Sequence, residues 1–344
     1  MAPPTHARTG GGDLAIEVTD LVKTYPAARK KPPVRALDGL TFDVPAGVVL
    51  GLLGPNGAGK STAVKILTTL SRADSGTARV AGLDVVKDQQ AVRLAIGYVP
   101  QQSSSDPMAT GTENLVLSGR IYGLSRSDSV RRAAELLERF GLAEAADRQV
   151  RTYSGGMQRK LDVALGLVHR PRVLFLDEPT TGLDPEARAD LWTEVERLSA
   201  AEGLTVLLTT HYLEEADRLA AQLAIVDHGK VVASGSPEEL KAELHGDSVQ
   251  VELADAASTT RVHSLISGLR GIGEVVVDGN VVRARVDHGA TAVPAVLGVL
   301  EEQEIPVAAV TVARPTLDDV YLRYTGRTFR AAEQASDAEK ERAA

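Results

Sequence analysis

Residues 54–61 have the types and spacing of a loop that binds phosphate groups. They read Gly-Pro-Asn-Gly-Ala-Gly-Lys-Ser, after an apolar run and before a helical pattern. Glycines let the backbone curl so that successive N–H groups converge on phosphate oxygens, and the positive end of the following helix strengthens the attraction. Lys60 suits the β- and γ-phosphates of ATP, and the Ser61 hydroxyl suits Mg²⁺. The residues expected to contact ATP are Gly54, Pro55, Asn56, Gly57, Ala58, Gly59, Lys60, Ser61 and Thr62.

A second apolar run, at residues 173–176, ends in Asp177 and Glu178. Acids at the carboxyl end of a parallel strand lie at the edge of the sheet where ligands bind. Asp177 is expected to hold Mg²⁺, directly or through water, and Glu178 to orient or deprotonate the attacking water. Without the phosphate loop upstream this pattern is weak, because two acids at a strand end can also simply cap a loop.

His211 ends the strand pattern that comes next after the acids, directly behind Thr209 and Thr210. A lone histidine is usually an ordinary loop residue, but a parallel sheet would bring this one to the same edge as Glu178. We expect His211 to contact the γ-phosphate or to polarise Glu178.

Residues 153–156, Tyr-Ser-Gly-Gly, precede a strong helical pattern. Ser154 is a good N-cap, so this segment could simply begin a helix. A helix N-terminus with bare glycines also offers amide groups to an anion. The spacing alone leaves open whether Ser154, Gly155 and Gly156 reach the nucleotide at the phosphate loop.

The elements that must position these residues alternate between strands and helices over residues 13–243. The apolar runs at 48–53, 174–176 and 206–208 are continuous, as in parallel strands covered by helices on both faces. A helix-rich part lies at about residues 102–170. One predicted helical face in it consists of Val130, Ala133, Leu136, Leu137 and Phe140. These patterns predict an α/β fold with a mostly parallel central sheet.

A smaller α+β domain is predicted at residues 246–327. Its patterns follow the order β-α-β-β-α-β, which is that of ferredoxin-like domains, and an amphipathic segment follows at 317–324. Residues 1–12 form a Pro/Gly-rich arm, and residues 328–344 a charged tail. Both are predicted to be disordered.

Charge and composition exclude several classes of protein. A formal net charge of −8 argues against a general nucleic-acid binder, so no nucleic-acid partner is expected. The 344 residues include no cysteine, which excludes disulfides and thiolate metal sites. No apolar run is long enough to span a membrane, and the N-terminal residues lack the apolar core of a secretory signal. We therefore expect any membrane role to come from a partner.

Together these motifs resemble the ATP-binding cassette of ABC transporters over about residues 14–243. The phosphate loop is similar to the Walker A motif of that family, and residues 174–178 to its Walker B motif. Ser154 and the two glycines resemble the family signature, and His211 its switch histidine. The resemblance implies a P-loop NTPase fold in which an antiparallel β portion and a helical subdomain flank the central sheet.

The same resemblance implies roles for residues that the patterns alone do not single out. Tyr25 matches the aromatic residue that stacks on adenine, and Asp184 matches the segment that crosses the dimer interface. Gln101 matches the glutamine that contacts Mg²⁺ and senses the membrane partner, with Gln102 beside it as the alternative. The implied catalytic residues are Glu178 and His211, and the implied metal ligands are Ser61, Gln101 and Asp177.

In this family two cassettes dock head to tail, and each ATP lies between Walker A of one chain and the signature helix of the other. The resemblance thus implies a dimer with a second copy or a paralogue. It also implies a peripheral subunit on the cytoplasmic side of the cell membrane that drives a separate transmembrane permease. Tyr153, where the signature usually begins with Leu, and residues 314–322 resemble the daunorubicin-resistance type of drug-exporter ATPase. Export is therefore expected, while the cargo stays open among drugs, antibiotics, lipids and polysaccharides.

Two other functions fit parts of the sequence. A cassette protein without a permease, acting in translation or DNA repair, would usually carry two cassettes or long coiled coils, and neither pattern is present. A P-loop kinase would leave Ser154 and His211 unexplained. For the C-terminal domain we expect a role in supporting the dimer and its assembly.

Overall fold

The computed structural model describes residues 13–26, 33–244, 246–254, 259–287 and 289–335. The predicted disordered arm, and residues 336–344 of the predicted tail, lie outside these ranges. The chain divides into two compact units, of which the first ends at Ser234 and the second begins at Gly235. Of the helices in the described ranges, none combines the length and apolar character that crossing a membrane requires.

The central sheet of the first unit is six-stranded, in the order β10-β9-β3-β8-β7-β6. The ladders that join β3, β6, β7, β8 and β9 are parallel, and β3 and β7 are buried at every position, as their continuous apolar runs predict. The strands are β3 (Val49–Leu53), β6 (Ile96–Val99), β7 (Val173–Asp177), β8 (Thr205–Thr210), β9 (Gln222–Asp227) and β10 (Lys230–Gly235).

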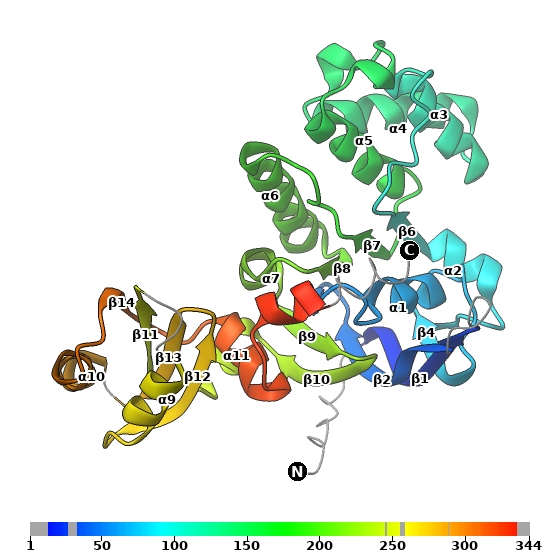
Figure 1. The fold of residues 1–344 in the computed structure, drawn as a ribbon. Coiled ribbons are helices and arrows are strands. Elements are labelled where there is room, and N and C mark those ends of the chain that lie inside the picture. The colour runs from blue at the N-terminus through cyan, green and yellow to red at the C-terminus, as the bar shows by residue number, and fades with distance from the viewer. Residues whose placement is uncertain (1–12, 27–32, 245, 255–258, 288, 336–344) are drawn as a thin grey trace. The chain divides into compact units, whose positions relative to one another are not determined.

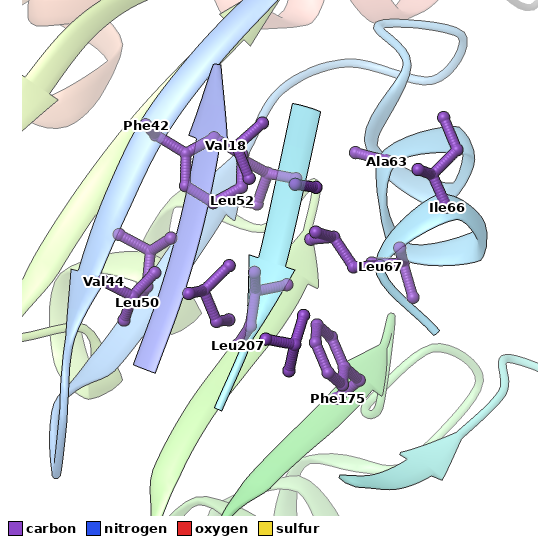
Figure 2. Packing of buried hydrophobic residues seen from close by; sticks show 14 of the residues in the cluster. Val18, Phe42, Val44, Leu50, Leu52, Ala63, Ile66, Leu67, Phe175 and Leu207 are labelled. Carbon is purple, nitrogen blue, oxygen red and sulfur yellow. The ribbon is translucent and has the colours of Figure 1, made fainter. Parts of the chain in front are cut away.

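A four-stranded sheet in the order β2-β1-β4-β5 forms the predicted antiparallel portion. Its strands are β1 (Leu14–Tyr25), β2 (Val34–Pro45), β4 (Ser75–Val80) and β5 (Leu83–Asp84). One buried cluster joins this sheet to the central sheet and to helix α1 (Lys60–Leu67), with Val18, Phe42, Leu52, Ile66 and Phe175 among its members (Figure 2). The helix that follows the phosphate loop is thus fixed from two sides by apolar packing.

Helices α3, α4 and α5 gather into the predicted helical subdomain (Figure 1). The predicted apolar face is buried at Ala133, Leu136 and Leu137 of α4 and at Phe140, its C-cap, whereas Val130 on the same face is 49 % exposed. The helices of the first unit that follow α1 are α2 (Gln89–Ala95), α3 (Gly111–Ile121), α4 (Arg126–Arg139), α5 (Gly155–Leu167), α6 (Pro185–Glu202) and α7 (Leu213–Leu219), with short 3₁₀ turns at Ala143–Ala145 and Val150–Thr152.

The second unit contains an antiparallel sheet in the order β12-β13-β11-β14. This order and the β-α-β-β-α-β sequence of its elements confirm the predicted ferredoxin-like arrangement. The elements are α8 (Pro237–Ala242), β11 (Asp247–Leu253), α9 (Thr259–Ser267), β12 (Ile272–Asp278), β13 (Val281–Val286), α10 (Gly289–Glu302), β14 (Val307–Ala313) and α11 (Leu317–Thr325).

Both ends of the second unit differ from the prediction. The unit begins before the predicted boundary at residues 243–246, because α8 packs with α11. Residues 328–335, predicted to belong to a disordered tail, are part of the unit. Phe329 is buried there, and its ring lies 4.9 Å from that of Tyr321. Burial of Phe329 in this way orders residues 328–335, whose charged composition alone predicts disorder.

Candidate active site

The phosphate loop connects the end of β3 to the first turn of α1. Gly57 and Gly59 have φ angles of 79° and 107°, a left-handed region in which a side chain is strained. A Cβ atom at Gly54 would overlap the carbonyl oxygen of Val226, and one at Gly59 that of Ala36. Glycine is therefore required for the conformation of the loop and for its close packing against β9 and β2.

Lys60 is only 4 % exposed, and its ammonium group lies within the loop. Its Nζ donates to the carbonyl oxygens of Gly54 at 2.5 Å and Pro55 at 3.1 Å. The same nitrogen lies 3.7 Å from Oε1 of Glu178. The positive charge of the loop is thus adjacent to the acidic end of β7.

Asp177 joins the loop to two strands of the sheet. Its Oδ1 accepts from the Ser61 hydroxyl at 3.1 Å and from the Thr209 hydroxyl at 2.7 Å. The Thr209 hydroxyl also accepts from the backbone N–H of Glu178 at 3.0 Å. Sequence reasoning assigned no role to Thr209, although its place at the end of the strand beside β7 was the available signal.

Glu178 is buried, and its carboxylate lies among four polar groups. Oε2 accepts from Gln101 Nε2 at 3.0 Å and from the Thr181 hydroxyl at 3.4 Å, and His211 Nδ1 lies 3.4 Å away. Burial would raise the pKa of Glu178, but the contact with His211 and the charge of Lys60 outweigh it and hold the pKa below its ordinary value. The carboxylate is therefore ionised at neutral pH and suited to accept a hydrogen bond or a proton.

The backbone at Glu178 is strained. Its φ of 46° costs a non-glycine residue on the order of 1–3 kcal/mol, and such strain persists only where the surroundings enforce it. This conformation places the carboxylate just beyond the end of β7, beside Gln101 and His211.

The parallel register explains why residues distant in sequence meet here. Leu53 pairs with Thr210, and Asp177 pairs with Thr209, so the carboxyl ends of β3, β7 and β8 coincide. Strand β6, which leads to Gln101, pairs with β7 through Val99 and Leu176. The phosphate loop, both acids, Gln101 and His211 are thus brought to one edge of the sheet, and Gln101, not Gln102, is the glutamine that bonds to Glu178.

Tyr25 lies at the end of β1 and is 37 % exposed. It pairs with Val34 on β2, and Ala36 of the same strand touches Gly59 in the phosphate loop. An exposed aromatic ring on the strand that pairs with β2 offers a flat apolar face for a nucleotide base.

Ser154 caps the exposed N-terminus of α5, since its hydroxyl accepts from Met157 N at 3.2 Å. Asp184 caps α6 in the same way, accepting from Ala187 N at 2.8 Å. A Cβ atom at Gly156 would lie 2.8 Å from Cβ of Ala187, so the two helix starts lie side by side. The nearest side chains to Gly155 and Gly156 come from this start of α6, not from the phosphate loop.

Known proteins and family models match both units of the chain. A model described as "ABC transporter" matches residues 37–181. One described as "ATP-binding protein DrrA1-3-like, C-terminal domain" matches residues 235–325, beginning where the second unit begins.

Relatives match nearly the whole chain. The daunorubicin/doxorubicin resistance ATP-binding protein DrrA of Streptomyces peucetius is 45% identical over 95% of this chain and 97% of its own length. The daunorubicin resistance ATP-binding protein DrrA3 of Streptomyces coeruleorubidus is 46% identical over 94% and 99%, respectively. Among solved structures, a dimeric bacterial ABC transporter cassette matches with a TM-score of 0.59 and 25% identity, over 64% of this chain and 98% of that one.

Proposed function

The chain belongs to the ABC transporter ATP-binding proteins, a family of ATPases, and from this premise we propose that it hydrolyses Mg²⁺-bound ATP to power the export of a cargo through a separate transmembrane permease. One observation carries the proposal. Four separate segments, which carry Lys60, Gln101, His211 and the adjacent pair Asp177 and Glu178, converge on one edge of the parallel sheet.

The geometry supports a direct role for Glu178 in hydrolysis. Its ionised carboxylate accepts a hydrogen bond from the attacking water and takes the proton of that water as the new P–O bond forms. ADP then leaves with the bridging oxygen. His211 orients the carboxylate from one side, and Lys60 offsets negative charge on the β- and γ-phosphates.

The oxygen ligands in this site fit Mg²⁺. Adjacent ligands of an octahedral Mg²⁺ are about 3 Å apart, and the Ser61 hydroxyl lies 3.1 Å from Oδ1 of Asp177. The side-chain oxygen of Gln101 supplies a further hard ligand. When bound, the ion neutralises the phosphate charge that develops during transfer.

We assign the second wall of each ATP site to another copy of the chain. The N-terminus of α5, with Ser154, Gly155 and Gly156, is exposed and offers free amide groups to a phosphate. Asp184 lies on the same surface. The solved cassette that this chain resembles is described as dimeric, which supports the pairing.

The permease is proposed to dock in an apolar groove of about 510 Å³ in the first unit. Leu70, Leu94 and Ile121 in its lining are 62 %, 60 % and 74 % exposed, and such apolar exposure favours a protein partner. Tyr98 of β6 also lines the groove, three positions before Gln101. The occupant is an amphipathic cytoplasmic helix of the permease, so the chain works peripherally at the cytoplasmic face of the membrane.

The cargo is proposed to be a drug-like or lipid-like molecule, because two relatives are named for resistance to daunorubicin. The cargo itself contacts the permease. The test is co-expression of the tagged chain with the membrane protein from its neighbouring reading frame. Co-purification, together with Mg²⁺-dependent phosphate release from ATP, supports the proposal. ATP hydrolysis by a chain that binds no membrane protein would instead identify a cassette without a permease.

A further inference from the structure

Arg159 is a buried cation on the first turns of α5. It is 7 % exposed, and burial lowers the pKa of its guanidinium. Three of its nitrogens donate to backbone carbonyls: Nε to Pro179 at 2.6 Å, Nη1 to Pro100 at 2.6 Å, and Nη2 to Asp177 at 3.3 Å. A buried charge is stable only when its donors are satisfied, and here separate loops supply the acceptors.

These carbonyls flank the residues proposed to carry out hydrolysis. Pro100 precedes Gln101, while Asp177 and Pro179 stand on either side of Glu178. One guanidinium therefore fixes the backbone on both sides of Glu178, the residue whose φ is strained.

Asp162, one turn further along α5, holds the other side of the Gln101 loop. Its Oδ1 accepts from the Ser103 hydroxyl at 2.8 Å and from Ser104 N at 3.3 Å, and its Oδ2 lies 3.9 Å from Arg159 Nη1. Side chains of one helix, α5, therefore bond to the loop on both sides of Gln101.

We propose that Arg159 is a positioning residue for ATP hydrolysis, which holds Gln101 and Glu178 at bonding distance and attaches both to the helix that begins at Ser154. The inference rests on the proposed hydrolytic role of Glu178. Helix α5 would then have two roles. Its N-terminus would face the nucleotide bound to the partner, and its Arg159 would position Gln101 and Glu178 of its own chain.

An arginine is needed because its planar fork directs donors to acceptors in different directions. Lysine keeps the charge but cannot reach all three carbonyls. In Arg159→Lys we expect kcat to fall by about 10- to 100-fold, while KM for ATP changes by less than about threefold, since small displacements of catalytic groups have effects of this size. The matched control is Arg132→Lys. Arg132 is also largely buried and donates to the carbonyl of Leu167, at the far end of the same helix.

Hydrogen exchange in the nucleotide-free full chain provides a readout that does not depend on turnover. Amides in residues 98–104 and 176–182 should exchange faster in Arg159→Lys and at the wild-type rate in Arg132→Lys. In a Glu178→Gln background, Arg159→Lys should lower the residual rate no further, because both changes act on the same step. If Arg159→Lys does not fold, Asp162→Ala serves instead, with faster exchange expected in residues 98–104.

These experiments distinguish a failure of the proposed function from a failure of the proposed role of Arg159. A wild-type chain that releases no phosphate, alone or with its permease, overturns the proposed function. A wild-type chain that hydrolyses ATP while Arg159→Lys keeps its kcat and its exchange rates overturns only the role of Arg159. Equal losses in Arg159→Lys and Arg132→Lys also overturn it, since the effect would then be general damage to α5.

Discussion

The side-chain amide of Gln101 donates to the carboxylate of Glu178 at 3.0 Å, across 77 positions of sequence. Gln101 follows β6, and Tyr98 of that strand lines the groove assigned to the permease. A shift of β6 caused by movement of the proposed permease would therefore reach the carboxylate of Glu178, the proposed catalytic base, through one hydrogen bond. This relationship would give the proposed permease a physical route to control the rate of hydrolysis.

Replacement of Glu178 by Gln should preserve ATP binding and abolish most turnover. The amide keeps the size of the side chain but cannot accept a proton, so phosphate release should fall by about 100-fold or more. Binding of a fluorescent ATP analogue and phosphate release are the two measurements. Glu214→Gln, an exposed change at the start of α7, is the control and should leave both unchanged. Hydrolysis by Glu178→Gln at the wild-type rate would remove Glu178 from the mechanism.

Acid should remove a stabilising contribution that Glu178 makes at neutral pH. Its pKa in the folded chain lies below the ordinary value of 4.5, so its interactions with His211 and Lys60 stabilise the fold above pH 4.5. That contribution is lost as the pH falls through the lowered pKa. The difference in free energy of unfolding between wild type and Glu178→Gln should therefore persist down to pH 4.5 and shrink below it. Urea titrations across this range measure it, and a difference that vanishes near neutral pH would contradict an ionised carboxylate.

Tyr153→Phe should affect stability and leave hydrolysis intact. The Tyr153 hydroxyl donates to the carbonyl of Ala145 at 2.7 Å and so ties the start of α5 to a neighbouring turn. Loss of that bond should cost about 1 kcal/mol of unfolding free energy, seen as a lower melting temperature. The exposed Tyr25→Phe should melt like the wild type. A large loss of activity in Tyr153→Phe would mean that the departure from the usual Leu has a functional role.

Much of the site could be predicted because its residues follow strands, and parallel register brings strand ends together. The loop at Gly54, the acids after Leu176 and His211 all carried that signal. No such signal marked Arg159, because the position of a single arginine within a helix does not predict which backbone carbonyls it will bind. Phe329 was missed for a related reason: an isolated aromatic residue in a charged segment does not reveal the cluster that receives it.

Ile121→Glu should uncouple the chain from its permease without disturbing its own chemistry. Ile121 is the most exposed of the apolar residues lining the groove, so a charge there is tolerated in the free chain but opposes an apolar helix. Co-purification with the permease should fall at least about tenfold, whereas basal hydrolysis and melting temperature should not change. Val86→Glu, at an exposed apolar residue outside the groove lining, is the control. Equal retention of the permease by both variants would place its docking surface elsewhere.

Removal of the second unit should weaken dimerisation while leaving ATP binding in place. The cut belongs after Gly235, where β10 ends, because a cut at residue 246 would leave α8 without α11. Light scattering with ATP in a Glu178→Gln background measures the dimer. Deletion of residues 336–344 alone is the control and should keep it. A shortened chain that dimerises and couples as the full chain does would assign the second unit another role.

The positions of Ser154 and Arg159 on one helix have a consequence for kinetics. Five residues of helix span about 7.5 Å, so the amides proposed to meet the nucleotide of the partner are rigidly joined to Arg159, which we propose positions Glu178, the base of the same chain. In a dimer, ATP bound at one site would then align Gln101 and Glu178 at the other site. Hydrolysis should depend cooperatively on ATP concentration, and a mixed dimer with one Arg159→Lys subunit should lose that cooperativity before it loses affinity.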